Sequence, residues 1–273
     1  MVLFRLVTFD VTGTLLKFRM SPGEKYAEVA ANFGLKVEPR VLTNNFRTHF
    51  RDMCRRHPNF GHTTGLGWKK WWTSVVVETF SSSEKQKINE HVLKTIAETL
   101  IEDYKSCDCW VVTDGSVSAL SRFKESGMHL GVVSNFDSRL ENVLESTDLI
   151  KYFDFVLGSY AVGHEKPSAR IFNSALQSIP GAVQPNQALH VGNDPVLDFQ
   201  GARNAGWNAV LVREAKEHKV RTNVDIYKLY LICSVGYGGE MWALRKTKKS
   251  DGAMWDVAVA KGSKDKLDWQ CEK

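Results

Sequence analysis

The fold prediction for this chain begins with Leu6–Leu16, LVTFDVTGTLL. It opens with a nearly continuous apolar segment, which is typical of a short strand that is covered on both faces. The strand delivers one carboxylate, Asp10, into a turn that contains Gly13. In open parallel sheets, ligands bind beyond the carboxyl ends of the strands. Asp10 is therefore the first residue for which the sequence predicts a functional role.

Five apolar segments of this kind are expected to form one sheet. They are Leu6–Phe9, Leu130–Val133, Phe153–Leu157, Ala188–Val191 and Ala209–Val212. Helical patterns lie between the later segments, at Ser116–Ser126, Pro167–Ser178 and Val196–Ala205. This alternation predicts an α/β fold with a doubly wound, Rossmann-like parallel sheet.

Residues 18–110 show helical periodicity and no convincing strand. The expected helices are Pro22–Phe33, Pro39–Arg56, Trp68–Phe80 and Glu84–Tyr104. We therefore expect residues 1–17 and 111–213 to form the core and residues 18–110 to form an inserted four-helix cap. Residues 214–273 lose these patterns, and we expect a basic tail that is poorly packed or foreign to the domain.

Composition narrows the class of protein. The 273 residues are 43% hydrophobic and 25% charged, as in ordinary globular proteins, and no apolar run is long enough to span a membrane. The five cysteines are odd in number and form no CxxC pair, which favours reduced thiols and a cytoplasmic location, with nuclear entry possible. Most of the net charge of +5 lies in the tail, so nucleic acid is an unlikely partner.

Polar or ionisable side chains follow four of the expected strands. They are Asp10, then Ser134 and Asn135, then Lys166 in HEKP, then Asp194 and Asp198 in GNDPVLD. Each has an ordinary explanation by itself, because a lone aspartate usually caps a helix and a lone lysine is usually solvated. Their joint order predicts that four separate segments converge on one crevice.

At this point the sequence resembles the haloacid dehalogenase-like hydrolase superfamily over roughly residues 4–213. The motifs that carry the resemblance are FDVTGTL, VVSN, EKP and VGNDPVLDFQGARNAG. The resemblance implies a phosphatase in which Asp10 is the nucleophile and forms a covalent aspartyl intermediate with a small phosphomonoester. Ser134 and Lys166 stabilise the phosphoryl group, and Thr14 and Asn135 bind the substrate.

The same resemblance implies Mg²⁺ as cofactor, because Mg²⁺ takes octahedral oxygen ligands and keeps several waters. The implied ligands are the carboxylates of Asp10 and Asp194 and the main-chain carbonyl of Thr12, with Asp198 as a ligand or just outside the ligand shell. Neither the carbon skeleton of the substrate nor an oligomeric state follows from these motifs.

Thr12 departs from the superfamily pattern, in which phosphatases usually carry a second aspartate that acts as the acid and base. Threonine does not titrate near neutral pH, and general acid–base help is typically worth about 10²–10⁴-fold in rate. We therefore predict weak turnover, with a non-catalytic phospholigand-binding or regulatory protein as the alternative. Metal-free dehalogenation is disfavoured, because the carboxylates of Asp194 and Asp198 beside Asp10 repel one another without a cation.

The expected cap contains a tryptophan cluster, Trp68, Trp71 and Trp72, on one helical face. Packing in the core of the cap is the favoured interpretation, and contact with substrate is the alternative. Four further residues flank the neighbouring loop of the expected cap. A solvated loop is the favoured interpretation for them, and contact with an anionic substrate is the alternative: Arg55, Arg56, His57 and His62.

Overall fold

The computed structural model describes residues 4–82 and 88–212. Its central element is a five-stranded parallel sheet in the order β5-β4-β1-β6-β7. The strands are β1 (Leu6–Phe9), β4 (His129–Ser134), β5 (Phe155–Gly158), β6 (Ala188–Gly192) and β7 (Asn208–Leu211). The predicted doubly wound α/β class is confirmed, and every predicted core strand is present within two residues at each end. The predicted tail, residues 214–273, lies outside the described residues.

Strand β1 occupies the middle of the sheet, and this position explains its apolar sequence. Leu6 lies opposite His129 of β4 on one side and opposite Ala188 of β6 on the other. All four residues of β1 are buried. A central parallel strand with helices on both faces has no solvent side, so its residues do not alternate between apolar and polar.

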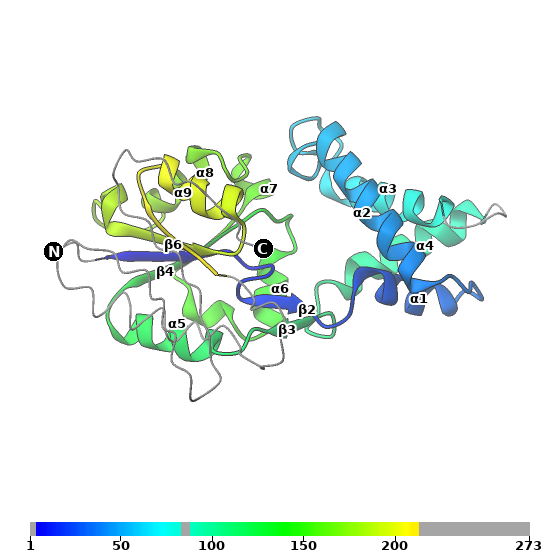
Figure 1. Ribbon diagram of the computed structural model, residues 1–273, viewed down its shortest axis with the longest axis horizontal. Helices are drawn as coiled ribbons and strands as arrows, with labels where there is room; N and C mark the ends of the chain where they lie inside the picture. Colours follow the sequence, from blue (N-terminus) through cyan, green and yellow to red (C-terminus); the bar gives the residue numbers. More distant parts are fainter. Residues whose placement is uncertain (1–3, 83–87, 213–273) are drawn as a thin grey trace, which may run out of the picture.

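Helices cover both faces of the sheet (Figure 1). α5 (Ser116–Glu125) and α6 (Leu140–Ser146) pack on one face, and α8 (Ala169–Gln177) and α9 (Gly201–Asn204) pack on the other. Short helical segments complete the core: η2 (Ile150–Tyr152), α7 (Ser159–Val162), η3 (Pro185–Gln187) and η4 (Pro195–Gln200). Phe9 packs with α5, whereas Leu6 belongs to the apolar cluster on the opposite face, so alternate residues of β1 serve the two cores.

The predicted helix Glu84–Tyr104 begins later in the structure, at Glu90, because Asn89 caps it by accepting the N–H of His91. Two predicted helices of the core also differ from the structure. α8 begins at Ala169 because Ser168 caps it by accepting the N–H of Arg170, so Pro167 precedes the helix instead of starting it. The predicted helix Val196–Ala205 is two elements, the wide π-helical turn η4 followed by α9. Sequence periodicity does not distinguish these turns, since the change depends on one bond across five residues, from Phe199 N–H to the Asp194 carbonyl (3.1 Å).

A two-stranded antiparallel ribbon at the two boundaries of residues 18–110 was not predicted, and only Phe18 and Trp110 of that range belong to it. β2 (Leu16–Phe18) pairs with β3 (Trp110–Val112), and the rings of Phe18 and Trp110 lie 4.7 Å apart. Three-residue strands are too short to show an alternating pattern, and their partners are distant in sequence. Both chain connections between the sheet and the helical insertion run through this ribbon.

The insertion contains the four expected helices and a short turn: α1 (Pro22–Ala31), α2 (Pro39–Arg56), η1 (Asn59–Gly61), α3 (Trp68–Ser81) and α4 (Glu90–Asp103). It buries an apolar cluster of its own, which includes Tyr26, Leu42, Phe80 and Ile96. The insertion extends to one side of the sheet and is joined to it through the ribbon (Figure 1). Across the residues that the structure describes, no helix is both long and apolar enough to cross a membrane.

Candidate active site

The turn after β1 fixes Asp10 at the end of the sheet. The Asp10 N–H donates to the Val191 carbonyl at 2.9 Å, which ties the residue to β6. Gly13 follows with a φ of 83°, a conformation that favours glycine. A Cβ atom at Gly13 would lie 2.5 Å from the side-chain nitrogen of Asn193. The glycine therefore allows the turn after β1 to approach the loop after β6.

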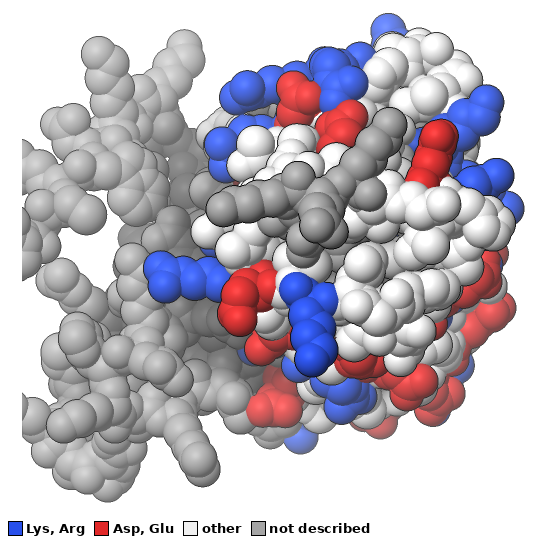
Figure 2. All heavy atoms as spheres, turned by 90° about the vertical axis from the view of Figure 1, so that its right-hand side faces the viewer, with Lys and Arg blue, Asp and Glu red and all other residues white. Residues whose placement is uncertain are grey.

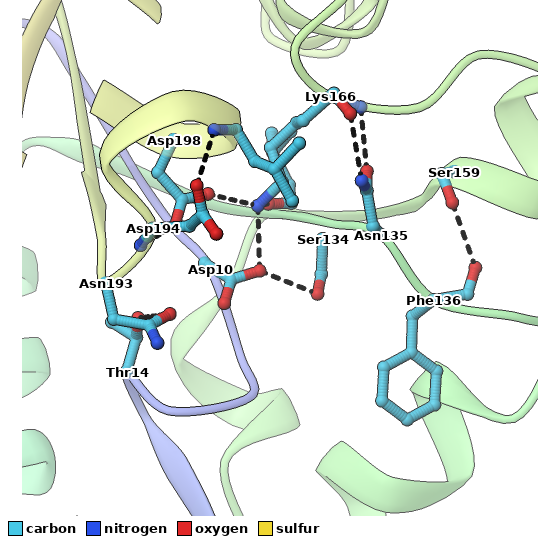
Figure 3. A network of polar contacts seen from close by, with 12 residues as sticks. Asp10, Thr14, Ser134, Asn135, Phe136, Ser159, Lys166, Asn193, Asp194 and Asp198 are labelled. Atoms are coloured by element: carbon cyan, nitrogen blue, oxygen red, sulfur yellow. Dashed lines mark hydrogen bonds and ion pairs between the residues drawn. The ribbon is translucent and has the colours of Figure 1, made fainter. Parts of the chain in front are cut away.

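One oxygen of the Asp10 carboxylate is held by two donors, and the other is not. Oδ1 accepts the hydroxyl of Ser134 at 2.9 Å and the ammonium of Lys166 at 2.7 Å (Figure 3). Oδ2 has no hydrogen-bond partner among residues 4–82 and 88–212. This arrangement orients the carboxylate and leaves one oxygen available as a nucleophile or metal ligand.

Lys166 is a buried cation with all three of its N–H donors in use. Nζ donates to Asp10 Oδ1 (2.7 Å), Asp198 Oδ1 (2.6 Å) and the Val133 carbonyl (2.9 Å). Burial by itself lowers the pKa of Lys166, but the charges of Asp10 and Asp198 outweigh it and raise the pKa above its usual value. The structure thus brings the predicted lysine against the predicted nucleophile, and that lysine is charged.

Asn135 holds the Lys166 loop through its side chain. Its Oδ1 accepts the Lys166 N–H at 2.7 Å, and its Nδ2 donates to the Lys166 carbonyl at 3.0 Å. Thr14 is fully buried, and its hydroxyl lies 3.4 Å from Asn193 Oδ1. The substrate-binding roles of Asn135 and Thr14 stay predictions, and their contacts in the structure join the loops that surround Asp10.

Asp198 is enclosed by protein donors. Oδ1 accepts from Lys166 and from His190 Nε2 (3.2 Å), and Oδ2 accepts the Asp194 N–H at 2.8 Å. Burial raises the pKa of Asp198, but the hydrogen bond from His190 and the charge of Lys166 hold it well below the ordinary range. Asp198 is an ionised anchor for Lys166, a geometry that suits a place just outside a metal's ligand shell.

Asp194 caps the wide turn η4. Its Oδ1 accepts the N–H groups of Val196 and Leu197, both at 2.8 Å. This is the usual role of an aspartate at a helix N-terminus. Its other oxygen, Oδ2, accepts no hydrogen bond from the described part of the chain. One oxygen positions the loop, and the second is available for a ligand.

The free oxygens fit the magnesium ion that the family resemblance implies. Asp194 Oδ2 and the Thr12 carbonyl are hard oxygen donors without hydrogen-bond partners among the described residues, and the Asp10 carboxylate would supply a third ligand while its Oδ2 stays free as the nucleophile. The described ranges contain no group of three His, Cys, Asp or Glu side chains arranged for a metal. Mg²⁺ does not require one, because it usually takes one or two carboxylates and fills its remaining positions with waters and substrate oxygens.

Sequence reasoning missed His190, which is fully buried in β6. Its ring bridges Thr8 and Asp198. The available signal was one polar residue inside an otherwise apolar strand, ALHVG, which by itself does not point to a site.

Sequence reasoning also missed the buried pair Asp137–Arg139, which lies just after Ser134 and contacts the insertion. Arg139 donates from Nε (2.9 Å) and Nη2 (2.6 Å) to the Asp137 carboxylate, and from Nη1 to the Ile101 carbonyl in α4 (3.3 Å). The Trp72 indole N–H of α3 donates to Asp137 Oδ2 at 2.6 Å. The pair therefore joins the loop after β4 to two helices of the insertion.

The three tryptophans of α3 divide between two roles. Trp71 is fully buried in the insertion, and its indole N–H donates to the His57 carbonyl at 2.9 Å. Trp68 and Trp72 flank the guanidinium of Arg139, with ring centroids 5.3 and 5.1 Å from its central carbon. Core packing is correct for Trp71. Trp72 also packs against the Trp71 ring within the insertion while it contacts Arg139, and Trp68 contacts Arg139.

Arg56 of the insertion forms ion pairs with two acidic residues. Its guanidinium donates to Asp52 at 2.7 Å and to Glu78 at 3.1 Å. The side chain that was considered as a substrate contact therefore already binds two carboxylates. Figure 2 views the molecule from the side of the insertion and shows basic and acidic side chains interspersed there, with large areas that carry neither.

Comparison with known proteins agrees with the class that the fold and the site define. Residues 4–206 match the model of the haloacid dehalogenase-like hydrolase family, and the chain belongs to that family. It is 39% identical over 218 residues to the Rhythmically expressed gene 2 protein of Drosophila melanogaster, covering 77% of this chain and 84% of that protein. It is 40% identical over 208 residues to human Haloacid dehalogenase-like hydrolase domain-containing protein 3, covering 76% and 81%.

Among solved structures, the fold resembles that of YfnB, a hydrolase of the same superfamily from Bacillus subtilis whose structure is described as bound to magnesium. The TM-score is 0.66 at 16% identity, and the match covers 85% of this chain and 99% of that one. At this identity the likeness establishes the shared fold.

Proposed function

We propose that this protein is a Mg²⁺-dependent phosphatase that acts on a small phosphomonoester through an aspartyl-phosphate intermediate, with weak turnover. The observation that carries the proposal is the Asp10 carboxylate, whose Oδ1 is held by Lys166 and Ser134 while Oδ2 lacks a hydrogen-bond partner in the described part of the chain. A nucleophile must keep one oxygen free and be fixed in direction, and both conditions are met here.

The chain's own residues account for the transfer step. Asp10 Oδ2 attacks phosphorus and forms a bond to it, the bond from phosphorus to the ester oxygen breaks, and the alcohol leaves with a proton taken from solvent water. Lys166 stays protonated and offsets negative charge beside the reacting oxygens, and Ser134 keeps the carboxylate in place. Water then attacks the aspartyl phosphate, which releases inorganic phosphate and restores Asp10.

Asp10, Asp194 and the Thr12 carbonyl would hold the magnesium ion, with Asp198 anchoring Lys166 beside them. The ion would supply charge neutralisation for the phosphate oxygens. The proposed cap, residues 18–110, would limit the access of water, as closing domains do in many enzymes.

The non-catalytic alternative rests on Thr12. The leaving oxygen needs a proton and the attacking water must lose one, and a threonine hydroxyl does neither efficiently near neutral pH. A protein with this site would still bind a phosphorylated ligand, because binding depends on Lys166 and the metal and not on an acid at position 12.

Substitution of the nucleophile separates these functions. Asp10→Asn keeps the shape and the acceptor for Ser134 but removes the nucleophilic charge, so phosphatase turnover with Mg²⁺ should fall to background. The protein should also lose the acid-stable ³²P label that wild type acquires from a labelled phosphomonoester. Asp114→Asn makes the same chemical change at an exposed residue and should leave both signals intact. Turnover that survives Asp10→Asn contradicts the proposal.

Magnesium binding has a readout that does not require turnover. A ligand that binds only the folded state stabilises it by about 2.7 kcal/mol at 100 times its dissociation constant. Urea unfolding of wild type should therefore shift to higher denaturant concentration when Mg²⁺ is added. The shift should be lost in Asp10→Asn and reduced in Asp194→Asn. An equal Mg²⁺ effect in all three proteins would place the ion elsewhere.

A further inference from the structure

His190 is a buried polar residue that the proposed reaction does not use. It lies in β6 opposite Thr8 of β1, and its side chain is fully buried. Nδ1 is 2.8 Å from the Thr8 hydroxyl and Nε2 is 3.2 Å from Asp198 Oδ1. The ring packs edge-on against Phe172, with centroids 5.3 Å apart. Both ring nitrogens therefore have partners on other elements.

His190 and Lys166 share one oxygen of Asp198. That oxygen, Oδ1, accepts from His190 Nε2 and from Lys166 Nζ, which lies 2.6 Å away. The carboxylate reaches this place because residue 192 is glycine. A Cβ atom at Gly192 would lie 2.2 Å from the Asp198 carboxyl carbon. Two residues of β6 thus act on Asp198. His190 donates a hydrogen bond to its carboxylate, and Gly192 leaves the space that the carboxylate occupies.

The hydrogen bonds define which nitrogen of His190 carries the proton. Asp198 is ionised and only accepts, so Nε2 must be the donor. Nδ1 then accepts from the Thr8 hydroxyl. Burial lowers the pKa of His190, which keeps the ring neutral and avoids a second cation beside Lys166. The neutral His190 ring can therefore donate to the Asp198 carboxylate without placing a second positive charge beside the Lys166 ammonium.

We propose that His190 is a positioning residue, and that its Nε2–H fixes the Asp198 carboxylate so that Asp198 directs the Lys166 ammonium at Asp10. The line of contacts runs from Thr8 through His190, Asp198 and Lys166 to Asp10. The expected effect of His190 on turnover rests on the proposed function, because it requires that Lys166 acts on the phosphoryl group. The positioning of Asp198 and Lys166 by His190 does not depend on the proposed function.

Nuclear magnetic resonance of the full chain tests the positioning directly. In ¹⁵N-labelled protein, the His190 imidazole should be the Nε2–H tautomer, and the Lys166 ammonium should give a slowly exchanging signal because it is buried with three acceptors. His190→Leu should shift or abolish that ammonium signal. His190→Gln, whose amide N–H reaches toward the position of Nε2, should restore it. Phe172→Leu, which disturbs the packing of the ring but no hydrogen bond, should leave it in place.

Turnover adds a second readout. In a Thr12→Asp background, His190→Leu should lower kcat about 10–100-fold, as loss of outer-shell partners typically does, while KM changes little and His190→Gln recovers most of the rate. If the ammonium responds as described but no variant turns over substrate, the positioning role holds and the proposed phosphatase function fails.

Three results would overturn the proposal: an Nδ1–H tautomer in wild type, an unchanged Lys166 signal in His190→Leu, or no restoration by His190→Gln. Should His190→Leu fail to fold, Thr8→Val supplies the second measurement, because it removes the partner of Nδ1 without touching Asp198. It should shift the His190 Nδ1 resonance and, through the ring, the Lys166 ammonium. No change in either also overturns the proposal.

Discussion

Thr12→Asp should raise phosphatase turnover with Mg²⁺ by about 10²–10⁴-fold over wild type, the range that general acid–base catalysis supplies. This corresponds to about 3–5 kcal/mol of barrier. Thr12 follows the nucleophile by two residues and is partly exposed, so a carboxylate there is not forced into an apolar environment. Its main-chain carbonyl, the proposed metal ligand, is unchanged by the substitution. Steady-state hydrolysis of small phosphomonoesters measures the effect.

The matched control is Thr12→Asn, which has nearly the same shape as aspartate but does not titrate. It should leave the rate at the wild-type level. Thr12→Asp combined with Asp10→Asn should be inactive, because the gained acid still needs the nucleophile. If Thr12→Asp stays at background while a phosphate analogue binds to both proteins, the non-catalytic alternative replaces the phosphatase.

Arg139→Met should destabilise the folded protein by about 3–5 kcal/mol, the typical cost of removing one partner from a buried ion pair. Asp137 is 2% exposed, so its carboxylate would remain buried without its cation. Arg139 also fills the space between Trp68 and Trp72, and its loss removes the guanidinium contacts with both rings. Urea unfolding, monitored by tryptophan fluorescence, measures the change.

Lys105→Met is the matched control, because it removes the cation of an exposed pair with Glu102. Exposed pairs are worth about 0–1 kcal/mol, so this change should be small. The double variant Asp137→Leu, Arg139→Met should be more stable than Arg139→Met alone, since no buried charge is left unpaired. A loss below about 1 kcal/mol in Arg139→Met would show that the pair does not hold the insertion to the core.

The sheet strands could be predicted because their signal is local. A central parallel strand is apolar throughout, and each of the five segments was found from its own residues, as with Leu6–Phe9. The ribbon of β2 and β3 could not be predicted, because its stability comes from pairing across the insertion and from the contact between Phe18 and Trp110. The π-helical turn was missed for the same reason, since it depends on loop contacts and not on periodicity.

The residues of the candidate site also fall into those that were predicted from the sequence and those that were missed. Asp10, Ser134, Lys166 and Asp198 were predicted because each follows a strand end, and parallel strands end at one edge of the sheet. His190 and the Asp137–Arg139 pair were not, because their roles depend on partners far away in the sequence. No local pattern distinguishes a histidine that bridges two strands from one that simply packs.

Residue patterns alone were enough to predict the five strands of the parallel sheet, the convergence of Asp10, Ser134, Lys166 and Asp198, and the replacement of the usual acid by Thr12. These features depend on periodicity and residue type, which are properties of the local sequence. The folded structure was needed to find that Asp198 anchors Lys166, that Asn135 holds the Lys166 loop, and that Asp137 and Arg139 join the insertion to the core. Those roles depend on which donor reaches which acceptor, and hydrogen bonds act over about 3 Å, a distance that only the folded chain defines.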